Sequence, residues 1–489
     1  MSMLCFVCLL ALPAQTLVED SPMPPDPPEE LLAAQAARGA FATAHVVWTM
    51  DEQTVGRRFF QSRFAGSAHL LVLHGDRHGA LRPDRVGQPG AYSEVRQLLL
   101  NDAQWVYVQD TPSVSVRHGG DAIPMLDIRT VGFMPYYSSS QGLTDEFLSD
   151  PDIQDYEVLH DSGALLITAR FTHGRAVRWW LDPKQGFQPT RCAMFLDEEF
   201  RGQTLTLYGE FDGVRFPQRL EYQDAEHEVT RSIDILLAAF NRPWHPASLG
   251  PADLGILPGH RVDSKDLGPS VAPVWDGAHV VTRDAFLARV GKGDLDAGAF
   301  ASMVQQVKER GGPGIRPAHT AEFNLEALRR TPQTWEAYVQ AFVRENDLDL
   351  DDIRKAWRLL EDARRRVHEY AESNAAGFSR LQQPRAAAAA RGSDQSGSQS
   401  GEQSGGMQPA EQAGGSEPVE QSGGSQPAEQ SGGSQPGEQA GKAVPADKPD
   451  DAKRRESQQA AEALERELLE PVGKIFDELV AALSSLKGG

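Results

Sequence analysis

The sequence predicts an α+β protein in which an antiparallel sheet is followed by a helical region and, beyond a linker, by C-terminal helices. Between residues 176 and 237, short stretches that alternate polar and apolar residues are separated by Pro, Gly and Asp turns. This pattern is typical of consecutive strands joined by hairpins. From residue 284 onward, apolar residues recur every three or four positions, as in amphipathic helices. Residues 385–449 carry almost no apolar side chains, which favours a disordered linker.

The region before these hairpins begins with one predicted helix and continues through several predicted strands. Residues 29–38 start with acidic residues, end with a basic one and precede Gly39, a pattern that predicts a helix. Strand patterns follow at residues 41–50, 58–64, 68–74, 104–109, 156–159 and 164–171. The third of these is apolar enough to be buried on both faces. Residues 119–155 fit no regular pattern, and we expect a lid-like segment there, with a short helix near residues 144–148.

One predicted hairpin indicates which face of the sheet is exposed to solvent (the wet face) and which is buried (the dry face). Asp212-Gly213 can supply the positive φ angles of a tight type I′ turn, and Pro217 fits near a strand start or at an edge. In the strand before this turn, alternation separates two sets of side chains. We expect the dry face to carry Leu205, Leu207 and Phe211, and the wet face to carry Thr204, Thr206, Tyr208 and Glu210.

The same stretch resembles a known protein family. The order Trp179-Trp-Leu-Asp-Pro-Lys-Gln-Gly-Phe-Gln-Pro-Thr-Arg, followed by Tyr208-Gly-Glu-Phe-Asp-Gly-Val-Arg-Phe-Pro-Gln-Arg-Leu-Glu-Tyr, resembles the LolA/LolB-like bacterial outer-membrane lipoprotein-sorting family. The resemblance covers residues 29–266. It implies a strongly curved antiparallel sheet, a half-barrel, which wraps packed helices and encloses an apolar cavity for acyl chains.

The resemblance also implies where a ligand would lie. We expect lipid or lipoprotein acyl chains in the concavity of the sheet, where each buried CH₂ group contributes roughly 0.8 kcal/mol. The predicted lining residues are Trp179, Leu181, Met194, Leu205, Leu207, Phe211, Leu220 and Tyr222. For each of these residues, the alternative is that its side chain belongs to an ordinary filled core.

Length and charge limit the classes of function. The chain has 489 residues, with 48 basic and 69 acidic side chains and a net charge of −21. This length predicts two or three domains. Because phosphate affinity comes mainly from clustered Lys and Arg, the acidic balance argues against a sequence-independent nucleic-acid-binding protein.

The N-terminus predicts export. Residues 3–14 form an apolar run that is too short to cross about 30 Å of hydrocarbon but fits the core of a signal peptide. We expect an export signal at residues 1–20, a Pro-rich spacer at 21–28 and a protein of the periplasm or cell envelope. No Lys or Arg precedes the run, so retention of this segment as an anchor is the alternative. Cleavage would leave Cys192 as the single cysteine, and its strand position favours inert core packing.

The second half of the chain is predicted to be helical. The sheet domain at 29–268 is followed by a helical region at 269–384, in which aromatic stripes at Trp335 and Trp357 favour packing over a cofactor site. After the linker at 385–449, residues 450–489 carry two apolar stripes, and Pro471 is predicted to begin a new helix. These C-terminal helices could dock back on the helical region, dimerise or bind a protein partner, and we favour docking back.

The sequence offers no catalytic constellation. His74 and His78 lie beside glycines, Ser138-Ser-Ser140 lacks a nucleophile elbow, and the acidic cluster at residues 347–352 lacks the spacing of a calcium loop. We therefore predict no catalytic residue, no metal and no cofactor. The predicted function is an exported non-enzymatic binding protein for an apolar ligand. The alternative is a cell-envelope scaffold or stress-sensor-like interaction protein whose helices bind a protein partner.

Overall fold

The structure, a computed structural model, confirms the α+β class. It describes residues 25–53, 56–74, 94–118, 125–134, 148–264, 273–291, 320–380 and 449–486, with short gaps inside several of these ranges. Residues 1–20, residues 144–147 of the predicted short helix and residues 385–448 of the predicted linker lie outside the described residues, so the predictions for them are not tested. Within the described part, no helix is both long enough and apolar enough to cross a membrane.

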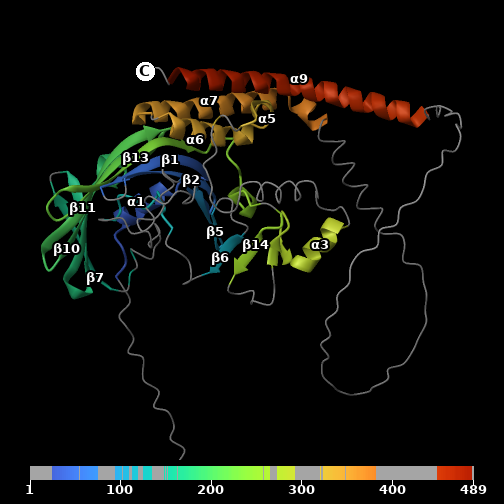
Figure 1. The fold of residues 1–489 in the computed structure, drawn as a ribbon. Helices are drawn as coiled ribbons and strands as arrows, with labels where there is room; N and C mark the ends of the chain where they lie inside the picture. Colours follow the sequence, from blue (N-terminus) through green and yellow to red (C-terminus); the bar gives the residue numbers. More distant parts are fainter. Residues whose placement is uncertain are drawn as a thin grey trace, which may run out of the picture. The chain divides into compact units, whose positions relative to one another are not determined.

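A curved, open sheet of sixteen strands dominates the fold (Figure 1). Its order is β16-β15-β14-β6-β5-β4-β3-β2-β1-β13-β12-β11-β10-β9-β8-β7, and neighbours are antiparallel except for the parallel pair β14 and β6. The strands are β1 Thr43–Glu52, β2 Gly56–Ala65, β3 Ala68–His74, β4 Glu94–Leu100, β5 Ala103–Val108, β6 Ser113–His118, β7 Ile153–Asp161, β8 Ala164–Phe171, β9 Arg175–Asp182, β10 Gln188–Leu196, β11 Glu199–Phe211, β12 Val214–Gln223, β13 Val229–Phe240, β14 Arg261–Ser264, β15 Pro273–Trp275 and β16 Val280–Thr282.

The predicted hairpins of this sheet are present. Asp212 and Gly213 have φ angles of 52° and 76°, so both adopt the left-handed conformation that a tight hairpin between β11 and β12 requires. Pro217 lies in the first part of β12, before its pairing with β13 begins at Arg219. Because proline has no N–H to donate, this placement leaves the β12–β13 pairing intact.

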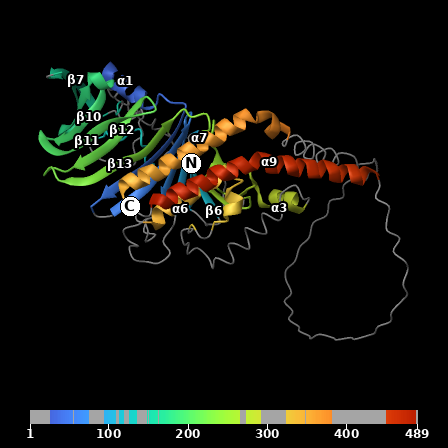
Figure 2. The ribbon, with the colours of Figure 1, turned by 90° about the horizontal axis from the view of Figure 1, so that it is seen from above.

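The helices α1 Glu29–Arg38, α3 Arg283–Gly291, α5 Leu325–Leu328, α6 Trp335–Glu345, α7 Leu350–Ser373 and α9 Pro449–Ser485 complete the fold. Helix α1 packs on the concave face through Leu31 and Ala34. Helices α6 and α7 lie across the convex face (Figure 2). The predicted bounds of α1, β3 and β8 match the structure, and α6 and α7 carry the predicted aromatic stripes.

Regular pairing continues further than the sequence suggested. The last strand patterns in the sequence lie before residue 237 and the predicted sheet domain ends at residue 268, but β14, β15 and β16 extend the sheet to Thr282. These strands are only three or four residues long, too short to show a clear alternation.

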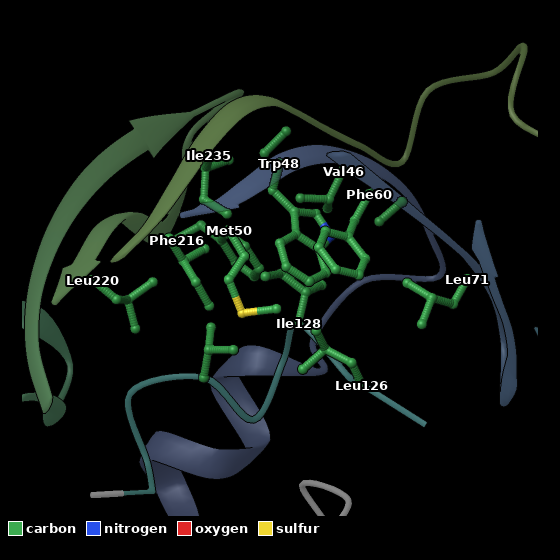
Figure 3. Close-up of a cluster of buried hydrophobic side chains, with 14 of the residues drawn as sticks. Val46, Trp48, Met50, Phe60, Leu71, Leu126, Ile128, Phe216, Leu220 and Ile235 are labelled. Carbon is green, nitrogen blue, oxygen red and sulfur yellow. The ribbon is translucent and has the colours of Figure 1, made fainter. Parts of the chain in front are cut away.

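The concave face holds a continuous apolar core over much of its width. Figure 3 shows side chains of β1, β2, β12 and β13 converging beneath the arch of the sheet, among them Trp48, Phe60, Phe216 and Leu220. Trp48 stacks on Phe60 with 4.0 Å between ring centroids. Residues 125–134, which we call the inner segment, pack against this core from below.

The helical layer on the convex face is joined to the sheet by buried ion pairs. Glu361 of α7 lies 3.2 Å from His45 Nδ1 on β1 and accepts a hydrogen bond of 3.0 Å from Trp244 Nε1. Glu336 of α6 pairs with Arg63 of β2 and with Arg364 of α7. This layer is therefore attached by charge pairing as well as by apolar contact.

The chain divides into two units, residues 1–368 with 475–489, and residues 369–474. In the first unit, residues 475–485 of α9 pack on α6, where Phe476 lies 5.4 Å from the Trp335 ring. The prediction that the C-terminal helix docks back is confirmed. In the second unit, Leu468 lies against Gly377. The predicted break at Pro471 is wrong, because α9 continues through this residue as one helix.

Candidate functional site

Half of the predicted lining residues lie in the filled part of the concavity. Trp179, Leu181, Leu220 and Tyr222 are all buried, and the first three have no exposed surface. Trp179 Nε1 donates a 2.7 Å hydrogen bond to the carbonyl of Phe133 in the inner segment. These side chains are thus packed against other parts of the same chain.

Two further predicted residues lie near the margins of this core. Met194 is paired with Val177 across β10 and β9, so both side chains lie on the same face, and Met194 is partly buried. Phe211 is also partly buried and packs against the core cluster of β1, β12 and β13.

The predicted faces of β11 are reversed for its central residues. Leu207 is 59% exposed, whereas Thr204 has no exposed surface and Tyr208 is buried. Leu205 shares the outward face and is partly buried. The reason is that the inward hydroxyl groups have partners: Thr204 Oγ1 donates to the Met134 carbonyl at 2.7 Å and the Tyr208 hydroxyl donates to the Pro189 carbonyl at 2.9 Å. Hydrogen-bonded polar groups can therefore occupy the interior.

The centre of the filled part contains a buried arginine. Arg38, at the end of α1, donates to Gln188 Oε1, to the Val131 carbonyl at 3.2 Å and to the Tyr208 hydroxyl at 2.7 Å. Burial lowers the pKa of this guanidinium. Three aromatic rings surround it, with the Phe133 centroid at 5.2 Å. The network fixes α1, the inner segment and the sheet to one another, so this half of the concavity is a structural core.

The other half of the concave face, on β3–β5, is apolar and partly exposed. Cross-strand partners lie side by side on one face of a sheet. Leu73 pairs with Val95, and Val95 pairs with Val108. Leu73 packs against the concave core cluster, so this whole row lies on the concave side.

The two neighbouring rows follow the same pattern. Leu71, which points into the core in Figure 3, pairs with Gln97, and Gln97 pairs with Val106. Leu99 lies between His69 and Gln104 and is 39% exposed. We call the following set the concave β3–β5 face: Leu73, Val95, Leu99, Val106 and Val108.

The opposite side of the same strands is covered. Leu70, Val72, Leu98 and Tyr107 are buried in a cluster with Leu249, Leu254, Ile256 and Trp275 from the segment after β13. This side of the strands is therefore packed within the chain, with Leu100 and Trp105 partly buried there. The exposed leucine of these strands, Leu99, lies on the concave side.

Two titratable groups, His69 and Asp127, lie near the concave β3–β5 face. His69 is buried, and burial lowers its pKa to about 4, so its imidazole is neutral at pH 7. Its ring stacks on Phe64 at 4.2 Å between centroids. Asp127 is held by Arg129 at 2.6 Å. Within the described ranges, no group of three or more His, Cys, Asp or Glu side chains could hold a metal ion.

This face was missed from the sequence because β4 was not predicted. Its sequence, Glu94-Val-Arg-Gln-Leu-Leu-Leu100, ends in three leucines that hide the alternation. The signal that could have revealed it lies in β5, where Val106 and Val108 alternate with Trp105 and Tyr107. Both sets are apolar, which indicates a strand with contacts on each face.

Comparison with known proteins gives similarity to solved structures over less than half of this chain. No protein-family model and no curated protein matches the chain. A DUF1329 family protein from Desulfovibrio piger is similar at 12% identity and a TM-score of 0.32, over 47% of this chain and 100% of that one. A LolA superfamily protein from Nitrosomonas europaea is similar at 11% identity and a TM-score of 0.27, over 44% and 93%. Lipoprotein LppX from Mycobacterium tuberculosis is similar at 11% identity and a TM-score of 0.17, over 44% and 94%.

These matches include a protein of the LolA superfamily, the family that the sequence resembles. At identities of 12% and below and TM-scores of 0.32 and below, they carry no argument about function.

Proposed function

We propose that this protein is a non-enzymatic binding protein that holds the acyl chain of a lipid or lipoprotein against its concave β3–β5 face. The observation that supports this proposal most directly is the partial exposure of apolar side chains on the inner side of a curved sheet, with Leu99 39% exposed. An acyl chain lying along these residues would remove both partners from water, at about 25 cal/mol per Å² of apolar surface.

The proposal moves the ligand away from most of the predicted lining residues. Trp179, Leu181, Leu220 and Tyr222 support the curvature by filling one half of the concavity. The residues that would contact the ligand belong to β3, β4 and β5. The apolar run at residues 3–14 further supports a protein that works outside the cytoplasm, in the periplasm or cell envelope.

The scaffold alternative receives less support from the helices. Ile475, Phe476, Leu479 and Leu483 of the C-terminal helix are buried. Arg329, which directly follows α5, also pairs with Asp477 at 2.9 Å. The apolar stripe that could have recruited a partner is therefore already covered within the chain.

The proposal is tested by a matched pair of leucine substitutions. The full chain is incubated with vesicles of diacyl phosphatidylethanolamine, separated from them, and analysed for retained lipid. Leu99→Glu places a carboxylate on the concave face, and Leu207→Glu places one on the convex side of β11, where the leucine is 59% exposed. Because an unpaired charge is costly to bury against hydrocarbon, we expect Leu99→Glu to reduce retained lipid by about tenfold or more.

Leu207→Glu should retain as much lipid as the wild type. Far-UV circular dichroism would confirm that both variants are folded. Equal loss in both variants, or no lipid retained by the wild type, would contradict the proposal.

A further inference from the structure

The β7 end of the sheet carries an apolar row on its outer side. Cross-strand partners lie on the same face of a sheet. One continuous row of such partners runs from β7 to β11, with one residue in each strand. We call this row the outer stripe, and its members are Leu159, Leu166, Trp180, Arg191 and Leu205.

Alternation places the outer stripe on the convex side of the sheet. Trp179 of β9 and Cys192 of β10 belong to the concave core, so the adjoining Trp180 and Arg191 face the other way. Helices α6 and α7 lie on this same side (Figure 2), but their ion pairs are with β2, β1 and β13, on the far side of β12 from the stripe.

The apolar side chains of the outer stripe are in contact with solvent. Leu159 is 47% exposed, and Leu166, Trp180 and Leu205 are partly exposed. Leu207, which follows Leu205 on the same face of β11, is 59% exposed. Contiguous apolar surface on a protein marks sites of interaction with other molecules. The stripe is therefore suited to burial under a partner.

Arg191 is the charged member of the outer stripe. Its guanidinium lies 4.1 Å from the centre of the Trp180 ring, an arrangement that favours a cation over an aromatic face. Among the described residues Arg191 forms no ion pair, and its Nε atom is buried without a hydrogen-bond partner. Burial lowers the pKa of this guanidinium, and no neighbouring carboxylate raises it.

Other arginines on the convex side have acidic partners. Arg178 pairs with Glu198 at 3.3 Å, and Arg219 pairs with Asp234 at 3.5 Å. A guanidinium forms strong, charge-assisted hydrogen bonds with a carboxylate. A carboxylate from outside the chain could therefore pair with Arg191 without displacing an ion pair of the described structure.

The helices already on the convex side show how this surface holds a helix. Glu361 of α7 lies 3.2 Å from His45 of β1, and Glu336 of α6 pairs with Arg63 of β2. In both cases a carboxylate of the helix meets a basic side chain of the sheet, next to apolar contacts. The outer stripe presents the sheet's half of such a contact, an arginine among apolar side chains.

We propose that the outer stripe binds an amphipathic helix of a partner protein, with a carboxylate of that helix on Arg191 and its apolar residues on the leucines. This surface lies on the opposite side of the sheet from the acyl-chain site, so the proposal is independent of that function. A second copy of the sheet would fit less well, because two convex surfaces touch over a small area.

The length of the stripe sets the length of the helix. From β7 to β11 there are four steps between neighbouring strands, which span about 19 Å at about 4.8 Å per step. An α-helix rises about 1.5 Å per residue, so about 13 residues cover this distance. Helices this short are marginal in water on their own, and docking on the stripe would stabilise one.

A pair of synthetic peptides tests the proposal. The first is a fluorescently labelled amphipathic helix of about 15 residues, with leucines along one face and one glutamate in the middle of that face. The second carries glutamine in place of the glutamate. Fluorescence anisotropy measures the binding of each peptide to the full chain. Arg191→Gln should weaken binding of the glutamate peptide by about five- to tenfold and leave binding of the glutamine peptide unchanged.

Matched variants separate this site from the acyl-chain site. Arg178→Gln removes a neighbouring arginine that pairs with Glu198, and it should bind both peptides like the wild type. Leu207→Glu should weaken binding of both peptides and leave lipid retention unchanged. Leu99→Glu should do the reverse. Loss of lipid binding would leave the peptide expectations unchanged, so the two proposals fail separately.

The proposal would be overturned if the glutamate peptide showed no saturable binding, or if Arg191→Gln and Arg178→Gln bound it equally. It would also be overturned if binding were lost in Leu99→Glu and kept in Leu207→Glu, because the peptide would then occupy the concave face. A wild-type dimer in analytical ultracentrifugation that Leu207→Glu dissociates would assign the stripe to a second copy of the chain, which would overturn the proposal as well.

Discussion

The buried carboxylate of Glu361 should make attachment of the helical layer dependent on pH. Burial alone would raise the pKa of Glu361, but contacts with His45, Arg364 and Trp244 outweigh it and lower the pKa to about 2. A glutamate in water has an ordinary pKa of 4.5. The charged form is therefore favoured in the folded protein, and it contributes stability above pH 4.5 that is lost as the pH falls toward 2.

The size of the effect follows from the shift. A difference of one pKa unit corresponds to about 1.4 kcal/mol, so the contribution of Glu361 near pH 7 is about 3 kcal/mol. Glu361→Gln keeps the shape of the side chain but removes the charge. We expect the variant to have a free energy of unfolding about 3 kcal/mol lower near pH 7, in line with other broken buried ion pairs.

Urea denaturation at a series of pH values measures this effect. The difference between wild type and Glu361→Gln should be largest near pH 7 and should shrink below pH 4.5. The control is Asp362→Asn on the same helix, whose side chain is 51% exposed and pairs with Arg365, and it should cost less than about 1 kcal/mol. A difference that stays constant from pH 7 to pH 3 would refute the reasoning.

Three further predictions concern packing. Arg38→Ala removes a buried side chain and leaves its hydrogen-bond acceptors without a donor, so it should lower the free energy of unfolding by about 3 kcal/mol in thermal denaturation; a cost below about 1 kcal/mol would contradict this. Gly132→Ala should cost about 1–3 kcal/mol, because φ is +87° and the new Cβ would lie 2.7 Å from Thr206 Oγ1, whereas Gly213→Ala, with open space around it, should cost less. Phe476→Ala should speed hydrogen exchange in α6 as the C-terminal helix loosens, and unchanged exchange would show that this contact does not hold the helix.

The sequence predicted the parts of the sheet where turns and alternation agree. The run from β8 to β13 is bounded by residues such as Asp212-Gly213 whose backbone preferences define the hairpins. The resemblance to the LolA/LolB-like family added the curvature. Both signals act locally along the chain, which explains why strand positions were predictable there.

The concave β3–β5 face was not predictable by the same signals. Alternation in β11 assigned Leu207 to the interior, but Thr204 and Tyr208 occupy it because the inner segment and neighbouring strands supply hydrogen-bond partners that are distant in sequence. The exposure of Leu99 likewise depends on which segments, distant in sequence, pack against the concave side of β4. These are tertiary contacts, and no pattern within a single strand encodes them.

The helical half shows the same limit. The apolar stripe of α6 was evident, but its contact with Phe476 joins residues separated by the long linker. The charge pairs between α7 and the sheet connect Glu361 to His45, whose positions differ by 316 residues. An apolar stripe predicts that a helix face is covered without identifying the segment that covers it.

The central claim is that an acyl chain lies on the concave β3–β5 face, and photocrosslinking tests it most directly. The full chain would be loaded with a phospholipid that carries a diazirine in its acyl chain, irradiated, digested and mapped by mass spectrometry. We predict crosslinks concentrated on β3, β4 and β5, at and beside Leu73, Leu99 and Val106. Crosslinks confined to residues on the convex face of the sheet or to the helices, or an absence of crosslinked lipid, would contradict the account.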